Sequence, residues 1–118
     1  MSKQLEERFL GFALRVRNFC QQLKWNVINQ EYIKQLVRCS GSVGANYIEA
    51  SDDLGKQDER MKIKISRREA KESLYWLSLV LIHENAELEQ EKLALIDEGT
   101  QIVRILSSIL QKLETNAR

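Results

Sequence analysis

The chain has 118 residues, the length of one domain, with 43% hydrophobic and 30% charged residues, five glycines and no proline. This composition is rich in helix formers and poor in helix breakers, so we expect a single all-helical domain over residues 1–118. The 18 lysines and arginines nearly balance 17 aspartates and glutamates, for a net charge of +1. A surface for nucleic acid must therefore be a local patch.

The cysteine and apolar patterns indicate a reduced, soluble protein. Cys20 and Cys39 fall within apolar helical patterns, and His83 is the single histidine, which leaves too few soft ligands for a zinc site. The first turn is charged and lacks a signal-peptide pattern, and the longest uncharged apolar run, residues 74–82, is about half of what a membrane-spanning helix needs. We expect a cytoplasmic protein with no cofactor, metal or membrane partner.

Two amphipathic helices are predicted in the first half of the chain. Residues 3–24 carry apolar side chains at steps of three and four, namely Leu5, Phe9, Phe12, Val16, Phe19 and Leu23. After a short link, Asn29 is a good helix N-cap, with Glu31 in the first turn. The stripe of the second helix then consists of Ile33, Leu36, Ser40, Val43, Tyr47, Ala50 and Leu54.

Two further helices follow a break at Asp52, Asp53 and Gly55, where Gly55 is the expected C-cap. The third helix is predicted over residues 56–85, with a stripe of Ile63, Ser66, Ala70, Ser73, Leu74, Leu77 and Leu81. The fourth is predicted over residues 89–115, with Leu95, Gly99, Ile102, Leu106, Ile109 and Leu113. Four stripes with short connections predict an antiparallel up-down-up-down four-helix bundle.

The segment RCSGSVGANYIEAS, residues 38–51, contains two glycines three apart, which suit either a phosphate loop or a close helix contact. A phosphate loop needs a preceding strand and a Gly-Lys-Ser/Thr ending, and a GxxG clamp for RNA belongs to a mixed α/β domain. Neither context is present. We therefore expect the second helix to pack closely on the third through small residues: Ser40, Gly41, Gly44 and Ala45 against Ser66, Ala70 and Ser73.

The third helix is apolar on a second side as well. Away from its buried stripe lie four apolar residues, Met61, Ile65, Trp76 and Leu79. Since a four-helix bundle covers one stripe per helix, we expect this second face to meet another subunit. The alternative is that Trp76 is a partly exposed residue of the bundle itself.

A row of basic residues also follows the third helix at steps of three and four. This basic ridge consists of Arg60, Lys64, Arg67 and Lys71, with Arg68 beside it. Such a ridge can contact phosphates, and a ring of subunits would repeat it around an axis and add weak contacts through avidity. Because Glu69 and Glu72 lie nearby, a solvated or ion-paired face is the alternative.

No catalytic pattern emerges. A di-iron bundle needs Glu-x-x-His pairs on facing helices, whereas Val80 stands three residues before His83 and no second histidine exists. The serines lack a nearby histidine base, and thiols within an apolar pattern are normally inert. We expect no enzymatic activity, and interpret His83 as a cap or surface ion-pair residue.

With these residues described, the chain resembles the four-helix-bundle family of 23S rRNA intervening-sequence proteins over nearly its whole length. One part of the resemblance is RCSGSVGANYIEAS, where the matching residues are Arg38, Ser42, Val43, Asn46 and Glu49. The other is KISRREAKESLYWLSLV, residues 64–80, with Glu69, Ala70, Glu72 and Trp76. The chain departs from the family at Tyr47, where a smaller or aliphatic residue is common.

The resemblance implies a bacterial cytoplasmic protein without enzymatic activity that assembles as a ring, commonly a pentamer. A related branch comprises accessory proteins of diversity-generating retroelements, which bind nucleic acid and a reverse transcriptase. We therefore predict a homo-oligomer that binds structured RNA or other nucleic acid through the basic ridge. The alternative is a protein-interaction scaffold that binds a partner protein and has no nucleic-acid role.

Overall fold

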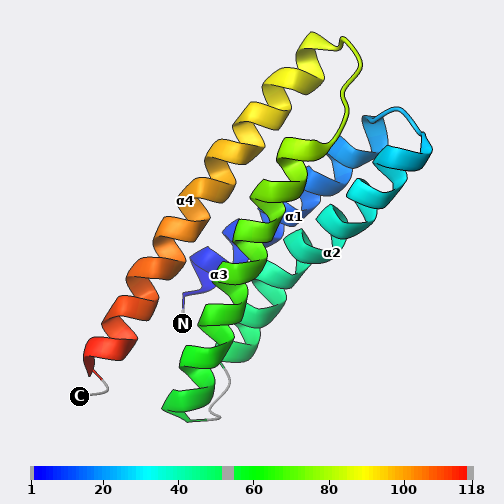
Figure 1. The fold of residues 1–118 in the computed structure, drawn as a ribbon. Helices are drawn as coiled ribbons and strands as arrows, with labels where there is room; N and C mark the ends of the chain where they lie inside the picture. The colour runs from blue at the N-terminus through cyan, green and yellow to red at the C-terminus, as the bar shows by residue number, and fades with distance from the viewer. Residues whose placement is uncertain (1, 52–54, 117–118) are drawn as a thin grey trace.

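The structure, a computed structural model, describes residues 2–51 and 55–116. Its four helices are α1 (Lys3–Gln22), α2 (Val27–Ala50), α3 (Lys56–Leu79) and α4 (Ala86–Asn116), and no strand occurs in the described residues. The helices run antiparallel to their neighbours in an elongated bundle, 51 × 22 × 21 Å (Figure 1). The prediction of an all-α four-helix protein is confirmed.

The ends of α2 differ from the prediction at two places. Asn26, not Asn29, is the N-cap of α2, because its side-chain oxygen accepts the backbone N–H of Asn29 at 2.8 Å. Gly55 precedes α3 at φ +100° and is not the C-cap of α2, a position that Ser51 takes. Asp52, Asp53 and Leu54 lie outside the described residues.

The third and fourth helices also have different bounds. α3 ends at Leu79, six residues earlier than expected, and α4 begins at Ala86. His83 and Glu84 have φ of 58° and 52°, which is incompatible with continuing a right-handed helix. Asn85 then accepts the backbone N–H of Leu88 at 3.0 Å and starts α4.

The core is built from the apolar stripes of all four helices. Fully or almost fully buried side chains include Phe9, Phe12, Leu36, Val43, Ile63, Leu77, Leu95, Ile102 and Leu106. Tyr47 is also buried: its ring meets that of Phe9 edge to face at 5.0 Å, and its hydroxyl oxygen accepts the backbone N–H of Ser2 at 2.9 Å. The larger residue at this position is thus accommodated because its polar end has a partner.

Small residues line the contact between α2 and α3. Ser66 Oγ donates to the backbone oxygen of Val43 at 2.7 Å, and Ser73 Oγ donates to Cys39 Sγ at 3.3 Å. Ala70 is fully buried between them. These short side chains let the two backbones approach closely, since each hydroxyl finds its partner across the seam.

The glycines of α2 do not take part in that seam, contrary to the prediction. A Cβ on Gly44 would meet Phe9 of α1 at 3.4 Å, and one on Gly41 would meet nothing within 4 Å. Ala45 is exposed and lies with both glycines along the surface between α1 and α2. The rotation of α2 about its axis therefore directs Ser40 to the interior, and Gly41, Gly44 and Ala45 to the α1 side.

None of the described helices combines the length and the apolar character required to cross a membrane.

Candidate nucleic-acid interface

Four residues of the basic ridge lie on the side of α3 that faces α4. Arg67 Nη1 donates to Ser107 Oγ of α4 at 3.4 Å, and Lys64 Nζ lies 3.9 Å from the Glu114 carboxylate. Residues at steps of three and four share one face of a helix, so Arg60 and Lys71 lie on the same side. The structure thus brings Arg60, Lys64, Arg67 and Lys71 together in one row.

Arg68 is separate from this row. Its guanidinium lies 3.7 Å from Glu69, whose other carboxylate oxygen accepts a hydrogen bond from Arg38 of α2 at 3.2 Å. Arg68 therefore leans toward α2, whereas the remaining ridge residues lie toward α4. The side chain of Arg68 is nevertheless mostly exposed.

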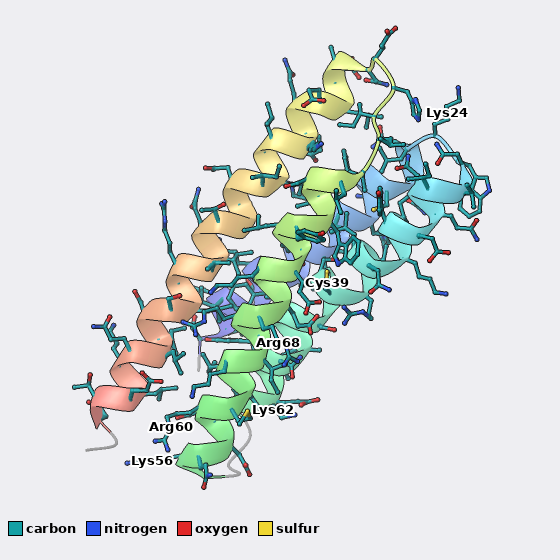
Figure 2. All side chains as sticks on the ribbon, in the orientation of Figure 1. Lys24, Cys39, Lys56, Arg60, Lys62 and Arg68 are labelled. Atoms are coloured by element: carbon teal, nitrogen blue, oxygen red, sulfur yellow. The ribbon has the colours of Figure 1, made fainter. Side chains whose placement is uncertain are left out.

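One further cation extends the ridge and was missed in the sequence. Lys56 is exposed and stands one helical turn before Arg60, and the two lie at the same end of α3 (Figure 2). The spacing of four residues between Lys56 and Arg60 was the feature of the sequence that could have predicted this extension. The predicted ridge began at Arg60 and did not extend to Lys56, the first residue of the predicted helix.

The acidic residues expected to neutralise the ridge have other partners. Arg38 of α2 binds Glu69 at 3.2 Å and Glu72 at 2.9 Å, which places both carboxylates in the seam between α2 and α3. Lys62 pairs with Glu49 across the same seam. Among the described residues no carboxylate lies within ion-pair distance of Arg60 or Lys71. The ridge consequently keeps much of its positive charge.

The predicted subunit-interface residues have unequal exposure. Met61 is exposed, whereas Ile65 and Leu79 are half-buried. Trp76 packs against the core, with its ring 6.0 Å from Tyr32 of α2 and 5.2 Å from Tyr75. Trp76 thus contributes to the bundle itself, as the alternative interpretation had it, and Tyr75 is the more exposed aromatic residue of this face.

Another exposed apolar surface, which the sequence interpretation missed, lies between α1 and α2. We call it the α1–α2 groove. One part of it, about 270 Å³, is lined by Leu10, Ala13, Gly41, Ala45 and Ile48 among others, and a second part, about 350 Å³, by Cys20, Trp25, Ile33 and Val37 among others. This surface could have been predicted from Leu10 and Val37, two apolar residues that lie outside the apolar stripes of α1 and α2.

The cysteines do not offer a reactive group to this surface. Cys20 and Cys39 are both buried, free thiols. Burial raises the pKa of Cys20 to about 12 and also raises the pKa of Cys39. Since the thiolate is the reactive form, both thiols are inert in the folded chain. Across residues 2–51 and 55–116, no group of three His, Cys, Asp or Glu side chains is placed to hold a metal ion.

Comparison with known proteins identifies the family. Residues 5–109 match the model of the 23S rRNA-intervening sequence protein family. The chain is 28% identical to a protein of unknown function from the S23 ribosomal protein family of Bacteroides thetaiotaomicron, known from its crystal structure. That alignment has a TM-score of 0.73 and covers 90% of this chain and 94% of the other. No curated protein shows significant similarity. The match over most of its length shows that the chain belongs to the 23S rRNA-intervening sequence protein family.

Proposed function

We propose that this protein is a non-enzymatic, cytoplasmic homo-oligomer that binds structured RNA or other nucleic acid through the basic ridge of α3. The expected assembly is a ring, with five subunits as the expected number. The observation that carries the proposal is that Arg60 and Lys71 have no carboxylate partner among the described residues, while the nearby Glu69 and Glu72 are both bound by Arg38.

The ridge suits a phosphate backbone for a physical reason. Cations spaced one helical turn apart along a rigid helix present a line of positive charge, and binding phosphates releases counterions from the nucleic acid. The net charge of the chain is only +1, so the attraction is local to the ridge. A ring would repeat the ridge in every subunit, and several weak contacts would then act together.

A charge-reversal experiment tests this function. The paired variant Arg60→Glu, Lys71→Glu is compared with wild type for binding to a fluorescently labelled RNA hairpin at low salt. The matched control is Lys24→Glu, Lys34→Glu, which changes the net charge equally at two exposed positions outside α3 and α4. We expect the ridge variant to lose at least about tenfold in affinity and the control to lose much less.

Two results would overturn the proposal. One is the absence of any binding of wild type to RNA or DNA hairpins at low salt. The other is an equal loss in the ridge variant and the control, which would indicate a response to net charge alone. The ring is tested separately, by light scattering at micromolar concentration. A mass equal to that of one subunit would contradict it.

A second candidate function is a scaffold for a partner protein, and the exposed apolar α1–α2 groove favours it. The two candidates are separated by purifying the protein from its own cells at low salt and sequencing any nucleic acid that accompanies it. Reproducible enrichment of one RNA supports the first candidate. A preparation free of nucleic acid but containing one stoichiometric protein supports the second.

A further inference from the structure

An exposed aromatic ring continues the basic ridge toward the C-terminal end of α3. Tyr75 stands four residues after Lys71 on this helix, so the two side chains share one face. Tyr75 is 61% exposed, and Lys71 is also exposed. The row of cations that begins at the start of α3 is therefore followed, one helical turn beyond Lys71, by an aromatic ring open to solvent.

A second cation lies beyond this ring. Lys92 Nζ of α4 donates to the backbone oxygen of Ser78 at 3.5 Å, and Ser78 stands about one turn after Tyr75 on α3. Within residues 2–51 and 55–116 no carboxylate lies at ion-pair distance from Lys92. Tyr75 thus lies along α3 between two cations, Lys71 on one side and Lys92 on the other.

The Tyr75 ring is supported from the side of α2. Its centroid is 5.2 Å from that of Trp76, with the two planes 79° apart, and the Trp76 ring is 6.0 Å from Tyr32 of α2. Trp76 itself packs against the core. Because the ring already rests on a fixed neighbour, it loses little conformational freedom when a flat ligand covers its exposed part.

The charge around the ring favours an anionic ligand. The carboxylate nearest to Tyr75 in the sequence of α3 is Glu72, which accepts a hydrogen bond from Arg38 Nη2 of α2 at 2.9 Å. That carboxylate is therefore directed to the α2 side of α3, whereas Lys92 reaches α3 from α4. A ligand that covers Tyr75 from the α4 side meets an aromatic ring with cations before and after it.

A row of cations that includes an exposed aromatic ring suits a single strand better than a duplex. Phosphates of either form can bind the cations, but only an unpaired base has a face free to stack on an aromatic side chain. In a paired stem the faces of the bases are covered by their neighbours. A duplex would use the cations of the ridge and leave the Tyr75 ring without a partner.

From these observations we propose that the ridge binds a single-stranded segment of nucleic acid, with an unpaired base stacked on Tyr75 and adjoining phosphates held by Lys71 and Lys92. This assignment rests on the proposed function and names the class of its ligand. In a structured RNA the bound segment is a loop or an overhang. Stacking accepts every base, because each has a π face, so the contact selects single strands without selecting a sequence.

Fluorescence anisotropy with two labelled probes tests the stacking. One probe is a single-stranded RNA of about 12 nucleotides without self-complementarity, and the other is the blunt-ended duplex of the same sequence. We expect Tyr75→Leu to lose at least about fivefold in affinity for the single strand and to bind the duplex as wild type does. Tyr75→Phe, which keeps the ring, should bind both probes like wild type.

The matched control is Trp25→Leu. Trp25 is 72% exposed and lies outside α3 and α4, so the variant removes an exposed aromatic ring that is not part of the ridge. We expect it to bind both probes like wild type. Lys92→Gln should lower the salt slope for the single strand by about 0.7, the value of one phosphate contact, whereas Lys34→Gln on α2 should not change it.

Photocrosslinking provides a measurement that needs no substitution. A single strand that carries 5-iodouracil is bound to wild-type protein and irradiated, and the modified residue is found by mass spectrometry. Because this base couples to an aromatic ring on which it stacks, we expect the adduct at Tyr75. A binding strand that gives adducts only at other residues would contradict the proposal, whatever the stability of the variants.

The outcomes separate this inference from the proposed function. If wild type binds neither probe at low salt, both are wrong. If the Arg60→Glu, Lys71→Glu pair loses affinity while Tyr75→Leu binds the single strand like wild type, the ridge stands and the stacking is wrong. Equal losses of Tyr75→Leu on the two probes also overturn the stacking. So does a lower mass of Tyr75→Leu by light scattering without an adduct at Tyr75, because Tyr75 is then a subunit contact.

Discussion

Asn29 and Leu81 are joined by a reciprocal pair of hydrogen bonds across one end of the bundle. The backbone N–H of Leu81 donates to Asn29 Oδ1 at 2.8 Å, and Asn29 Nδ2 donates to the Leu81 oxygen at 2.9 Å. The same amide donates to the Lys24 oxygen at 3.1 Å. One fully buried side chain therefore ties the α1–α2 connection to the α3–α4 connection.

Replacing this amide should be costly. In Asn29→Ala the backbone groups of Leu81 and the oxygen of Lys24 lose their partners, so we expect the free energy of unfolding to fall by about 2–4 kcal/mol. Urea denaturation followed by circular dichroism measures the change. The control is Asn18→Ala at an exposed helical position, for which we expect a change within about 0.5 kcal/mol. Equal effects in the two variants would contradict the assigned role.

The ion pair between α1 and α4 predicts a dependence on pH. Arg8 donates to both oxygens of Glu98, at 2.9 and 2.7 Å, and these hydrogen bonds lower the pKa of Glu98 from its ordinary value of 4.5. A carboxyl group with a lower pKa in the folded chain stabilises the fold above its unfolded pKa. This contribution disappears as the pH falls through the folded pKa.

Glu98→Gln should therefore be less stable than wild type near neutral pH, by about 1–2 kcal/mol, and the difference should shrink as the pH falls below the ordinary glutamate pKa. Denaturant midpoints measured along a pH series test this. Glu7→Gln, which removes an exposed carboxylate from the same helix as Arg8, serves as the control and should follow wild type. A constant difference between Glu98→Gln and wild type at all pH values would refute the linkage.

Two glycines in helices should respond oppositely to alanine. A Cβ on Gly11 would meet nothing within 4 Å, so Gly11→Ala should raise the free energy of unfolding by about 1 kcal/mol through helix propensity. A Cβ on Gly99 would lie 2.7 Å from Leu74 Cδ2 and 3.5 Å from Phe12 Cζ, so those side chains must shift. We expect Gly99→Ala to be about 1–3 kcal/mol less stable than Gly11→Ala by urea denaturation. Equal gains would show that Leu74 adapts freely.

The buried thiols should be unreactive in the folded protein. Burial raises the pKa of Cys20 from 9.0 to about 12 and raises that of Cys39, so the thiolate form appears only at correspondingly higher pH. At about pH 8 we expect Cys20 to react with a thiol reagent on the order of 10³-fold more slowly than in the unfolded chain. Reaction progress with and without guanidinium chloride measures this ratio. Immediate labelling of both thiols without denaturant would contradict it.

Removal of single ridge cations should change the salt dependence of RNA binding. Each phosphate contact contributes about 0.7–0.9 to the slope of log affinity against log salt concentration. Lys71→Gln should reduce that slope by about one contact, whereas Lys24→Gln, outside α3 and at the end of the bundle away from Lys56 and Arg60 (Figure 2), should leave it unchanged. Equal slopes for wild type and Lys71→Gln would remove Lys71 from the interface.

The sequence by itself determined the number of helices, most of the core and the family. Burial of one stripe is a local requirement with a period of 3.6 residues, so side chains such as Phe9, Leu36 and Ile102 could be assigned to the interior without knowledge of their neighbours. The chain contains no proline, so no residue of this type interrupts the predicted helices. The motif around Arg38 pointed to the family that the comparison then identified.

Only the tertiary structure decided which partner each remaining side chain meets. Asn26 and Asn29 are both good caps by type, and the choice depended on Leu81, a residue far along the chain that needs the Asn29 amide. Likewise Gly41 faces the groove with α1 because the rotation of α2 is set by its whole packing against α1 and α3 together. A periodic pattern specifies which stripe is buried, but the residues beside that stripe are placed by neighbouring helices that the pattern does not contain.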